Sequence, residues 1–272
     1  MDKPSKILFP LMDNHFAKLK DRWFAEAHEN VGHEKFINTA NEWFKGSKVN
    51  DIKGFENFQD IDVIIGCTQF IESFCLKNAW NVQVLPFDYS FYAVMGKQST
   101  EPGNLKPGVP LIISLPNWKF GDIYPGWQDI LKECEEKKID IHIDGAWLTC
   151  ARDIELDLNH PNIQSIGMSM SKYNLTWNRI GLRWSRQRSM DTITMFNVQR
   201  KYNESLTACG YFMMENIDRD YGWNTYRQKH FDLADKFNML PTKLLHVVQT
   251  KDKKGVMGIC LLYTSPSPRD RQ

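Results

Sequence analysis

Four short segments carry side chains that suit binding and proton-transfer chemistry, and each follows an apolar run. Asp144 ends the run IDIHID, so its carboxylate needs a cationic or donor partner to offset its lost hydration. Lys172 ends the segment SMSK, where a lysine shielded from water can act as an amine nucleophile. Arg179 can clamp a phosphate through two hydrogen bonds. The segment GCTQ at 66–69 opens a predicted helix, whose free amides, dipole and threonine hydroxyl favour a phosphate.

Each segment also has an ordinary structural explanation. The turn at 66–69 can be purely structural, and Asp144 can cap a helix or face a loop. Lys172 can be a solvated lysine at a strand end, and Arg179 can form a surface ion pair. The order and spacing of the four segments along the chain therefore carry more information than any one of them.

Short apolar runs separated by amphipathic stretches predict an α/β fold. The strand candidates lie at 61–66, 81–87, 110–116, 139–144, 163–169 and 179–185. Helical patterns at 68–78 and 126–138 lie between several of them. This alternation predicts a three-layer α/β/α domain with a mostly parallel sheet covered on both faces. Ligands of such sheets bind at the carboxyl ends of the strands, where the four segments lie.

The regions before and after these runs are predicted to be helical. Helical spacing at 14–30 and 34–44 predicts an N-terminal helical arm over residues 1–50. The large domain then spans 51–221, and the helical pattern that follows ends at Pro241.

The carboxyl-terminal part is predicted to be incomplete. Residues 222–259 are expected to form an interdomain helix and the start of a small α+β domain. Residues 260–272 change abruptly to Ser, Pro and Arg, which favours a non-native tail, with a natural disordered tail as the alternative.

Composition limits the classes of function. The 34 basic and 33 acidic residues give a net charge of +1, so no global field attracts nucleic acid or an anionic membrane. Neither a leader peptide nor an apolar stretch of about 18 residues is present, so neither export nor membrane insertion is expected. The six cysteines lack a C-x-x-C pair and disulfide-like spacing, which favours reduced thiols in a cytoplasmic protein and no metal site.

Taken in order, the GCTQ, IDIHID, SMSK and RIG segments resemble the aspartate-aminotransferase-like superfamily, the fold type I enzymes that use pyridoxal 5′-phosphate. The resemblance covers residues 60–181, with weaker agreement to about residue 257. It implies that Lys172 forms a Schiff base with the cofactor and that Asp144 keeps the pyridine nitrogen protonated. The phosphate ligands that it implies are Cys67, Thr68, Ser169 and Arg179.

Two more positions agree with the family. Asn117 matches an asparagine that donates to the cofactor's phenolic oxygen, and Tyr89 matches an aromatic ring stacked on the pyridine. Trp147 stands where a tyrosine is common, and its indole N–H can donate a hydrogen bond but cannot accept a proton. Trp118 replaces the proline that usually follows the asparagine. The chain therefore resembles a divergent branch.

The resemblance implies an aminotransferase that acts on amino-acid and 2-oxo-acid substrates as a homodimer. The same fold also supports lyase, decarboxylase and acyl-transfer chemistry, so these remain alternatives. An inactive fragment or noncatalytic relative is a further alternative. A plain dinucleotide-binding fold is disfavoured, because no G-x-G-x-x-G follows a predicted strand.

Overall fold

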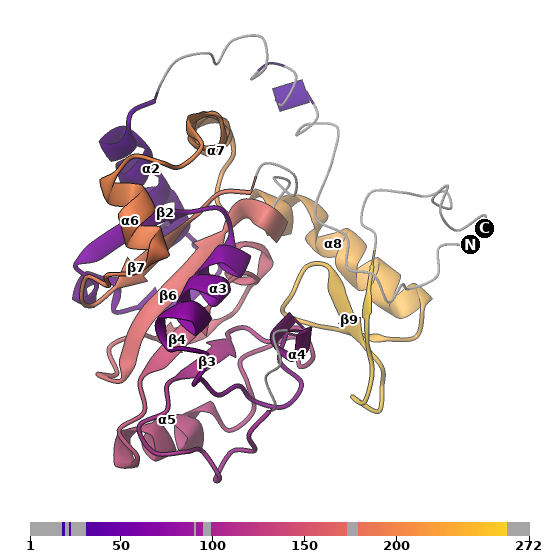
Figure 1. Ribbon diagram of the computed structural model, residues 1–272. Coiled ribbons are helices and arrows are strands. Elements are labelled where there is room, and N and C mark those ends of the chain that lie inside the picture. The colour runs from indigo at the N-terminus through magenta and orange to yellow at the C-terminus, as the bar shows by residue number, and fades with distance from the viewer. Residues whose placement is uncertain are drawn as a thin grey trace.

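A five-stranded sheet forms the centre of the computed structural model, which describes Lys18, Leu19, Arg22 and residues 31–89, 91–94, 99–172 and 179–259. Figure 1 shows its strands in the order β2-β7-β6-β4-β3. Their bounds are β2 (Asp60–Ile64), β3 (Leu111–Ser114), β4 (Ile141–Asp144), β6 (Ile163–Ser169) and β7 (Gly181–Ser185). Only β7 runs opposite to the others, so the sheet is mostly parallel, as the sequence predicts.

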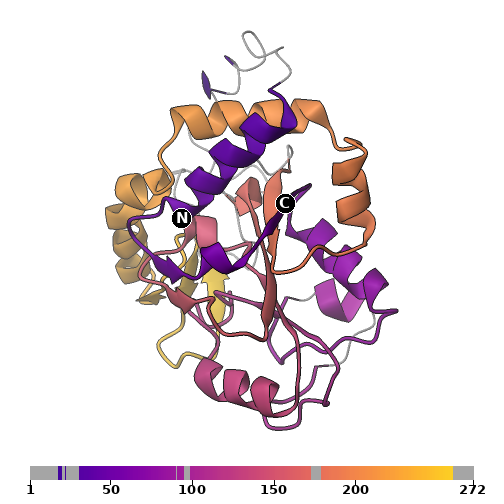
Figure 2. The ribbon, with the colours of Figure 1, turned by 90° about the vertical axis from the view of Figure 1, so that its left-hand side faces the viewer.

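Helices cover both faces of this sheet. On one face lie α3 (Cys67–Lys77) and α6 (Thr192–Val198), whose apolar side chains pack with Ile64 and Ile112. On the other lie α2 (His33–Lys45) and α5 (Trp127–Glu136), which belong to the larger core. In Figure 2, α3 and α6 lie on the side of the sheet opposite to α8 (Tyr221–Lys236). The three-layer α/β/α fold is thereby established.

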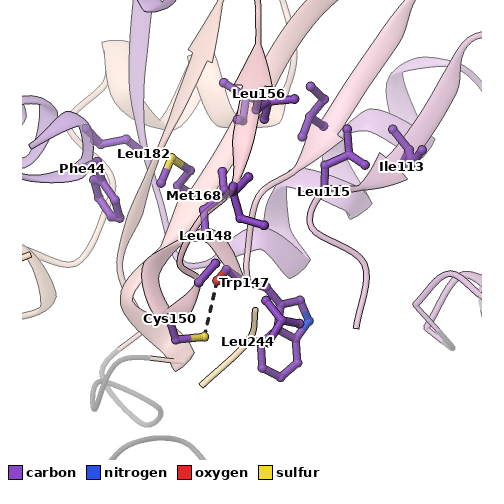
Figure 3. Packing of buried hydrophobic residues seen from close by; sticks show 14 of the residues in the cluster. Phe44, Ile113, Leu115, Trp147, Leu148, Cys150, Leu156, Met168, Leu182 and Leu244 are labelled. Carbon is purple, nitrogen blue, oxygen red and sulfur yellow. Dashed lines mark hydrogen bonds between the residues drawn. The ribbon is translucent and has the colours of Figure 1, made fainter. Parts of the chain in front are cut away.

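Alternation along the strands decides which side chains meet which layer. Ile141 and Ile143 of β4 face the larger core, part of which Figure 3 shows around Met168 and Leu148. His142 points to the opposite face, where its ring centroid is 4.4 Å from that of Phe74 in α3. Asp144, two residues further along, shares this face.

The predicted strand at 81–87 is not a regular strand. Gln83 and Val84 form only isolated bridges, with Leu111 and Ser99 respectively. Pro86 has no N–H for a ladder and is followed by a residue with positive φ, so the segment turns instead of extending.

Three further short elements, each of only three or four residues, escape sequence analysis because they are too short to show a periodic pattern. Strand β1 (Asp51–Lys53) pairs in parallel with β5 (Glu155–Asp157). Helix α4 (Phe91–Val94) follows the irregular segment around Pro86.

The region after β7 is largely helical, as predicted. Helix α7 (Glu204–Asn216) starts at Asn203, whose side chain accepts from the amides of its first turn. The last long helix, α8, ends at Lys236, before Pro241. Pro241 itself lies in a short strand of a separate three-stranded sheet, whose members are β8 (Leu240–Pro241), β9 (Val247–Gln249) and β10 (Val256–Gly258).

The predicted helix at 14–30 lies outside the described residues except for Lys18, Leu19 and Arg22, which are helical. The predicted tail at 260–272 lies wholly outside them. No helix in the described part of the chain is long and apolar enough to cross a membrane.

Burial of His142 predicts a measurable loss of stability in acid. Burial, with the nearby Lys77 and Arg183 charges, lowers the pKa of His142 to about 3. Because the unfolded chain then binds more protons below pH 6.5, stability falls as the pH drops through this window. Between pH 7 and pH 5 the unfolding free energy of the wild type should fall. We expect this fall to be about 2 kcal/mol smaller in His142→Gln, which has no imidazole to protonate. Urea denaturation at both pH values measures it, and an unchanged pH dependence would contradict the prediction.

Candidate functional site

A cavity of about 300 Å³ lies at the carboxyl ends of the parallel strands. It is bounded by the ends of β3, β4 and β6 and by the start of α3. All of the sequence-predicted site residues except Asn117 line it: Cys67, Thr68, Tyr89, Asp144, Trp147, Ser169, Lys172 and Arg179. The sequence analysis did not nominate the other lining residues, which are Ile71, Ser114, Trp118, Ala146 and Ser171.

The amino end of α3 forms one wall together with Arg179. Gly66 precedes the helix with φ +91°, and no side chain in the described part of the chain caps its first amides. Arg179 Nη2 donates to Thr68 Oγ1 at 2.7 Å. A Cβ at Gly66 would lie 2.9 Å from Arg179 Nε, so only glycine lets the guanidinium come this close. This wall therefore combines uncapped amides, a hydroxyl and a cation, which suits an anion.

Asp144 lies at the end of β4 and is 4% exposed. Its Oδ1 accepts from the Ala146 amide at 3.0 Å. Burial raises the pKa of the Asp144 carboxyl, while Ala146, the Cys67 thiol, Lys172 and Arg179 each act in the opposite direction. A carboxylate in this position would be stabilised further by a cationic donor in the cavity.

Cys67 is the first residue of α3, and its side chain contacts β6. Its Sγ donates to the Gly167 carbonyl at 3.4 Å. Burial raises the pKa of the Cys67 thiol well above its usual range, and the Asp144 charge raises it further. Cys67 is therefore a neutral thiol that donates hydrogen bonds, and it lacks the thiolate that nucleophilic chemistry needs.

Lys172 ends the short helix η3 (Met170–Lys172), which directly follows β6. Its Nζ lies 4.5 Å from the centroid of the Trp147 ring, a cation–π distance. Trp147 is buried and begins a turn in which Cys150 Sγ donates to its carbonyl, the dashed line in Figure 3. The lysine amine thus lies over the indole ring, and both side chains line the cavity.

Two side chains far along the sequence hold the turn that follows Trp147. Arg219 donates to the carbonyls of Leu148 and Thr149 at 2.7 and 2.9 Å, and Trp223 Nε1 donates to that of Cys150 at 2.8 Å. No local sequence pattern indicates these two side chains, because their contacts span about 70 residues.

Asn117 is the predicted site residue that the structure does not bring to the cavity. It is fully buried in a turn, where its Oδ1 accepts from the Lys119 amide at 2.8 Å. Its Nδ2 donates to the Phe87 carbonyl at 3.4 Å. Trp118, the next residue, lines the cavity instead.

Tyr89 lies at the mouth of the cavity and is 39% exposed. Its ring stacks on Phe91, with a centroid distance of 5.8 Å and an interplanar angle of 26°. Burial and the Asp144 charge raise the pKa of the Tyr89 hydroxyl, so it stays protonated and can donate.

Asp88 is a second carboxylate near the cavity, and sequence analysis missed it. It accepts from the Ser114 amide at 3.0 Å and from the Tyr89 amide at 2.7 Å. Burial raises the pKa of Asp88 to about 6, and the Asp144 charge contributes. A lone acidic residue after an apolar run is common and does not by itself indicate a site. The one feature of the sequence that could have indicated Asp88 is that it directly precedes Tyr89.

Among the described residues, no group of three or more His, Cys, Asp or Glu side chains could hold a metal ion. The five cysteines in this part of the chain are free thiols.

Comparison with known proteins reveals similarity of structure without similarity of sequence. No protein-family model and no curated protein matches the chain. A mutant of Thermus thermophilus aspartate aminotransferase superposes with a TM-score of 0.62 at 15% identity, covering 91% of this chain and 76% of that one. Alanine aminotransferase from Pyrococcus furiosus gives 0.61 at 13% identity, over 90% and 73%. Tyrosine aminotransferase from Leishmania infantum gives 0.59 at 12% identity, over 86% and 75%. The chain therefore has an aspartate-aminotransferase-like fold.

Proposed function

We propose that this protein is a pyridoxal-phosphate-dependent enzyme that acts on an amino acid, with aminotransfer as its reaction. The observation that carries the proposal is the convergence of Lys172, Asp144 and Arg179 on one cavity at the carboxyl ends of the strands. A lysine amine, a buried carboxylate and a guanidinium beside uncapped helix amides correspond to the aldehyde, ring nitrogen and phosphate of this cofactor.

Three features of the cavity fit such a group. The Arg179 Nε–H is buried and has no hydrogen-bond partner among the described residues, so it is available to an anion. Gly66 leaves space where a Cβ would collide with that guanidinium. Burial raises the Asp144 pKa, and a cationic N–H in the cavity would relieve this cost. The proposed phosphate ligands are Cys67, Thr68, Ser169 and Arg179.

When bound, pyridoxal phosphate supplies an aldehyde that links to amines and a ring that accepts electrons from the substrate's α-carbon. Asp144 would keep a proton on the ring nitrogen, and Tyr89 and Trp147 would supply aromatic walls. Lys172 would hold the cofactor and then move a proton at the substrate's α-carbon through Nζ, a role worth about 10²–10⁴-fold in rate. The Arg219 and Trp223 contacts keep the turn beside Lys172 in place.

The proposal also includes a domain division, a class of substrates and an assembly. Residues 51–221 would form the cofactor-binding domain, between the helical arm at 1–50 and the interdomain region at 222–259. Amino acids and 2-oxo acids would be the substrates, and a cytoplasmic homodimer would be the working assembly. Light scattering tests the assembly, and a monomer mass would contradict that part.

The direct test of the proposed function is covalent capture of the cofactor. Purified protein is mixed with pyridoxal phosphate, its absorbance spectrum is recorded, and borohydride is added before peptide mapping. We expect a visible band that disappears on reduction and a label on Lys172. A label spread over several surface lysines, or no visible band, would refute the proposal.

A further inference from the structure

We propose that a second cavity, at the opposite ends of the same strands, binds a small phosphate-bearing anion. This basal cavity has a volume of about 310 Å³, and its walls include Lys77, Lys138, His142, Arg183 and Arg188. It shares no lining residue with the first cavity, so it is a separate site.

The fold places the basal cavity at the other end of α3. Cys67 at the start of this helix lines the first cavity, and Lys77 at its end lines the basal one. Pro110 and Asp140, which directly precede β3 and β4, complete the basal wall. Figure 1 shows α3 running along the sheet between these two ends. The basal cavity therefore lies where strands begin, away from the usual ligand edge of a parallel sheet.

Three exposed basic side chains, Lys77, Lys138 and Arg188, line the basal cavity. Lys77, Lys138 and Arg188 form no salt bridge with any residue that the structure describes. Two acidic side chains also line the cavity: Asp191, which pairs with Arg183, and Asp140, whose pKa is raised by burial against the opposing charge of Lys77. Buried His142 adds no positive charge at neutral pH, because burial lowers its pKa to about 3. Apart from the ion pair of Arg183 with Asp191, the lining thus carries three cations against one carboxylate, which favours an anion.

Arg183 is a buried arginine in the lining of the basal cavity. It is 4% exposed, and its Nη atoms bond to Asp62, Asp191 and Thr194. Its Nε–H has no acceptor among the described residues, and an unmade hydrogen bond of a buried charged group is costly. Its charge is balanced by the two carboxylates, so this arginine offers a hydrogen bond more than a net charge.

Lys138 occupies a backbone conformation that glycine adopts more easily. It follows α5 with φ +54°, where bonds from Lys138 N to Glu135 O and from Ile139 N to Cys134 O close the helix. Glycine is the usual residue at such a helix end because a Cβ is disfavoured there. The carboxyl ends of α3 and α5 attract cations, which accounts for Lys77. The same dipole favours the charge of Lys138, but it accounts neither for the positive φ of this residue nor for Arg188.

The volume and the apolar wall of the basal cavity indicate what kind of ligand it can hold. Its volume is many times the ~30 Å³ that one water occupies in the liquid, so it can hold more than a lone inorganic phosphate. Phe70, Phe74 and Pro110 add an apolar wall. A phosphorylated small molecule with an organic part matches both the cations and this wall.

Calorimetric titration with inorganic pyrophosphate, on full-length protein saturated with pyridoxal phosphate, tests the proposal. We expect a dissociation constant below about 1 mM, and about tenfold weaker binding in Lys138→Gly. The thermal midpoint of this variant should stay equal or rise, because glycine fits the backbone better. Lys253→Gly is the matched control, since Lys253 also has a positive φ, of 59°, and lies exposed in the turn between β9 and β10. It should bind like the wild type.

The variant Arg179→Ala distinguishes binding at the basal cavity from binding at the first cavity. Arg179 lines only the first cavity, which pyrophosphate could also enter. Binding that persists in Arg179→Ala and weakens in Lys138→Gly supports the basal site. Three results would each overturn it: no heat of binding at about 10 mM pyrophosphate, equal affinities in the two glycine variants, or complete loss of binding in Arg179→Ala.

Discussion

Lys172→Ala is expected to abolish turnover and the covalent retention of pyridoxal phosphate while leaving the protein folded. The lysine ends η3 beside the cavity, and its amine contacts the Trp147 ring. Among the described residues, Lys172 is the one lysine that lines this cavity. Loss of the proton-transferring group alone costs about 10²–10⁴-fold. The lost cation–π contact costs stability only about 0.5–1 kcal/mol.

Two further variants separate the amine from its charge. Lys172→Arg keeps a cation beside Trp147, but a guanidinium cannot be deprotonated, so we expect it to be inactive as well. Lys243→Ala is the control, since Lys243 forms a surface ion pair with Asp122 at 2.8 Å and should react like the wild type. Turnover of the amino donor and the borohydride label report the results. An active Lys172→Arg protein would remove the amine from the mechanism.

Asp144→Asn is expected to lower turnover and, in cofactor-free protein, to raise stability. The substitution keeps the size of the side chain and removes the charge that would hold a proton on the cofactor ring. Losing an electrostatic group of this kind costs about 10²–10³-fold in rate. Burial raises the Asp144 pKa in the folded state, so ionisation destabilises the fold as the pH rises above the unfolded pKa. The neutral amide avoids this cost at pH 7.

A purely structural role of Asp144 does not predict lower turnover together with higher stability, so measuring both quantities tests the proposal. Thermal unfolding without cofactor should give a higher midpoint for Asp144→Asn than for the wild type at neutral pH, and the difference should shrink in acid. Asp129→Asn, at an exposed position in the first turn of α5, is the control and should not raise the midpoint. A less stable and fully active Asp144→Asn protein would show that the carboxylate has only a structural role.

The sequence determined the layered fold and the edge at which the candidate site lies. Apolar runs placed β2, β3, β4, β6 and β7, because a strand covered on both faces must be apolar throughout. The chemistry-bearing residues directly follow these runs, so parallel pairing alone brings Asp144 and Ser169 to one edge. Local patterns were sufficient here because the ends of adjacent parallel strands coincide.

Only the tertiary structure decided contacts that depend on distant segments. Asn117 accepts from the Lys119 amide and donates to the distant Phe87 carbonyl, and no local pattern indicates this pairing. Arg219 reaches the turn after Trp147 across about 70 residues. The basal cavity gathers Lys77, Lys138 and Arg188 from three separate segments. Side chains that meet through packing leave no periodic trace in the sequence, so their partners become visible only once the layers are assembled.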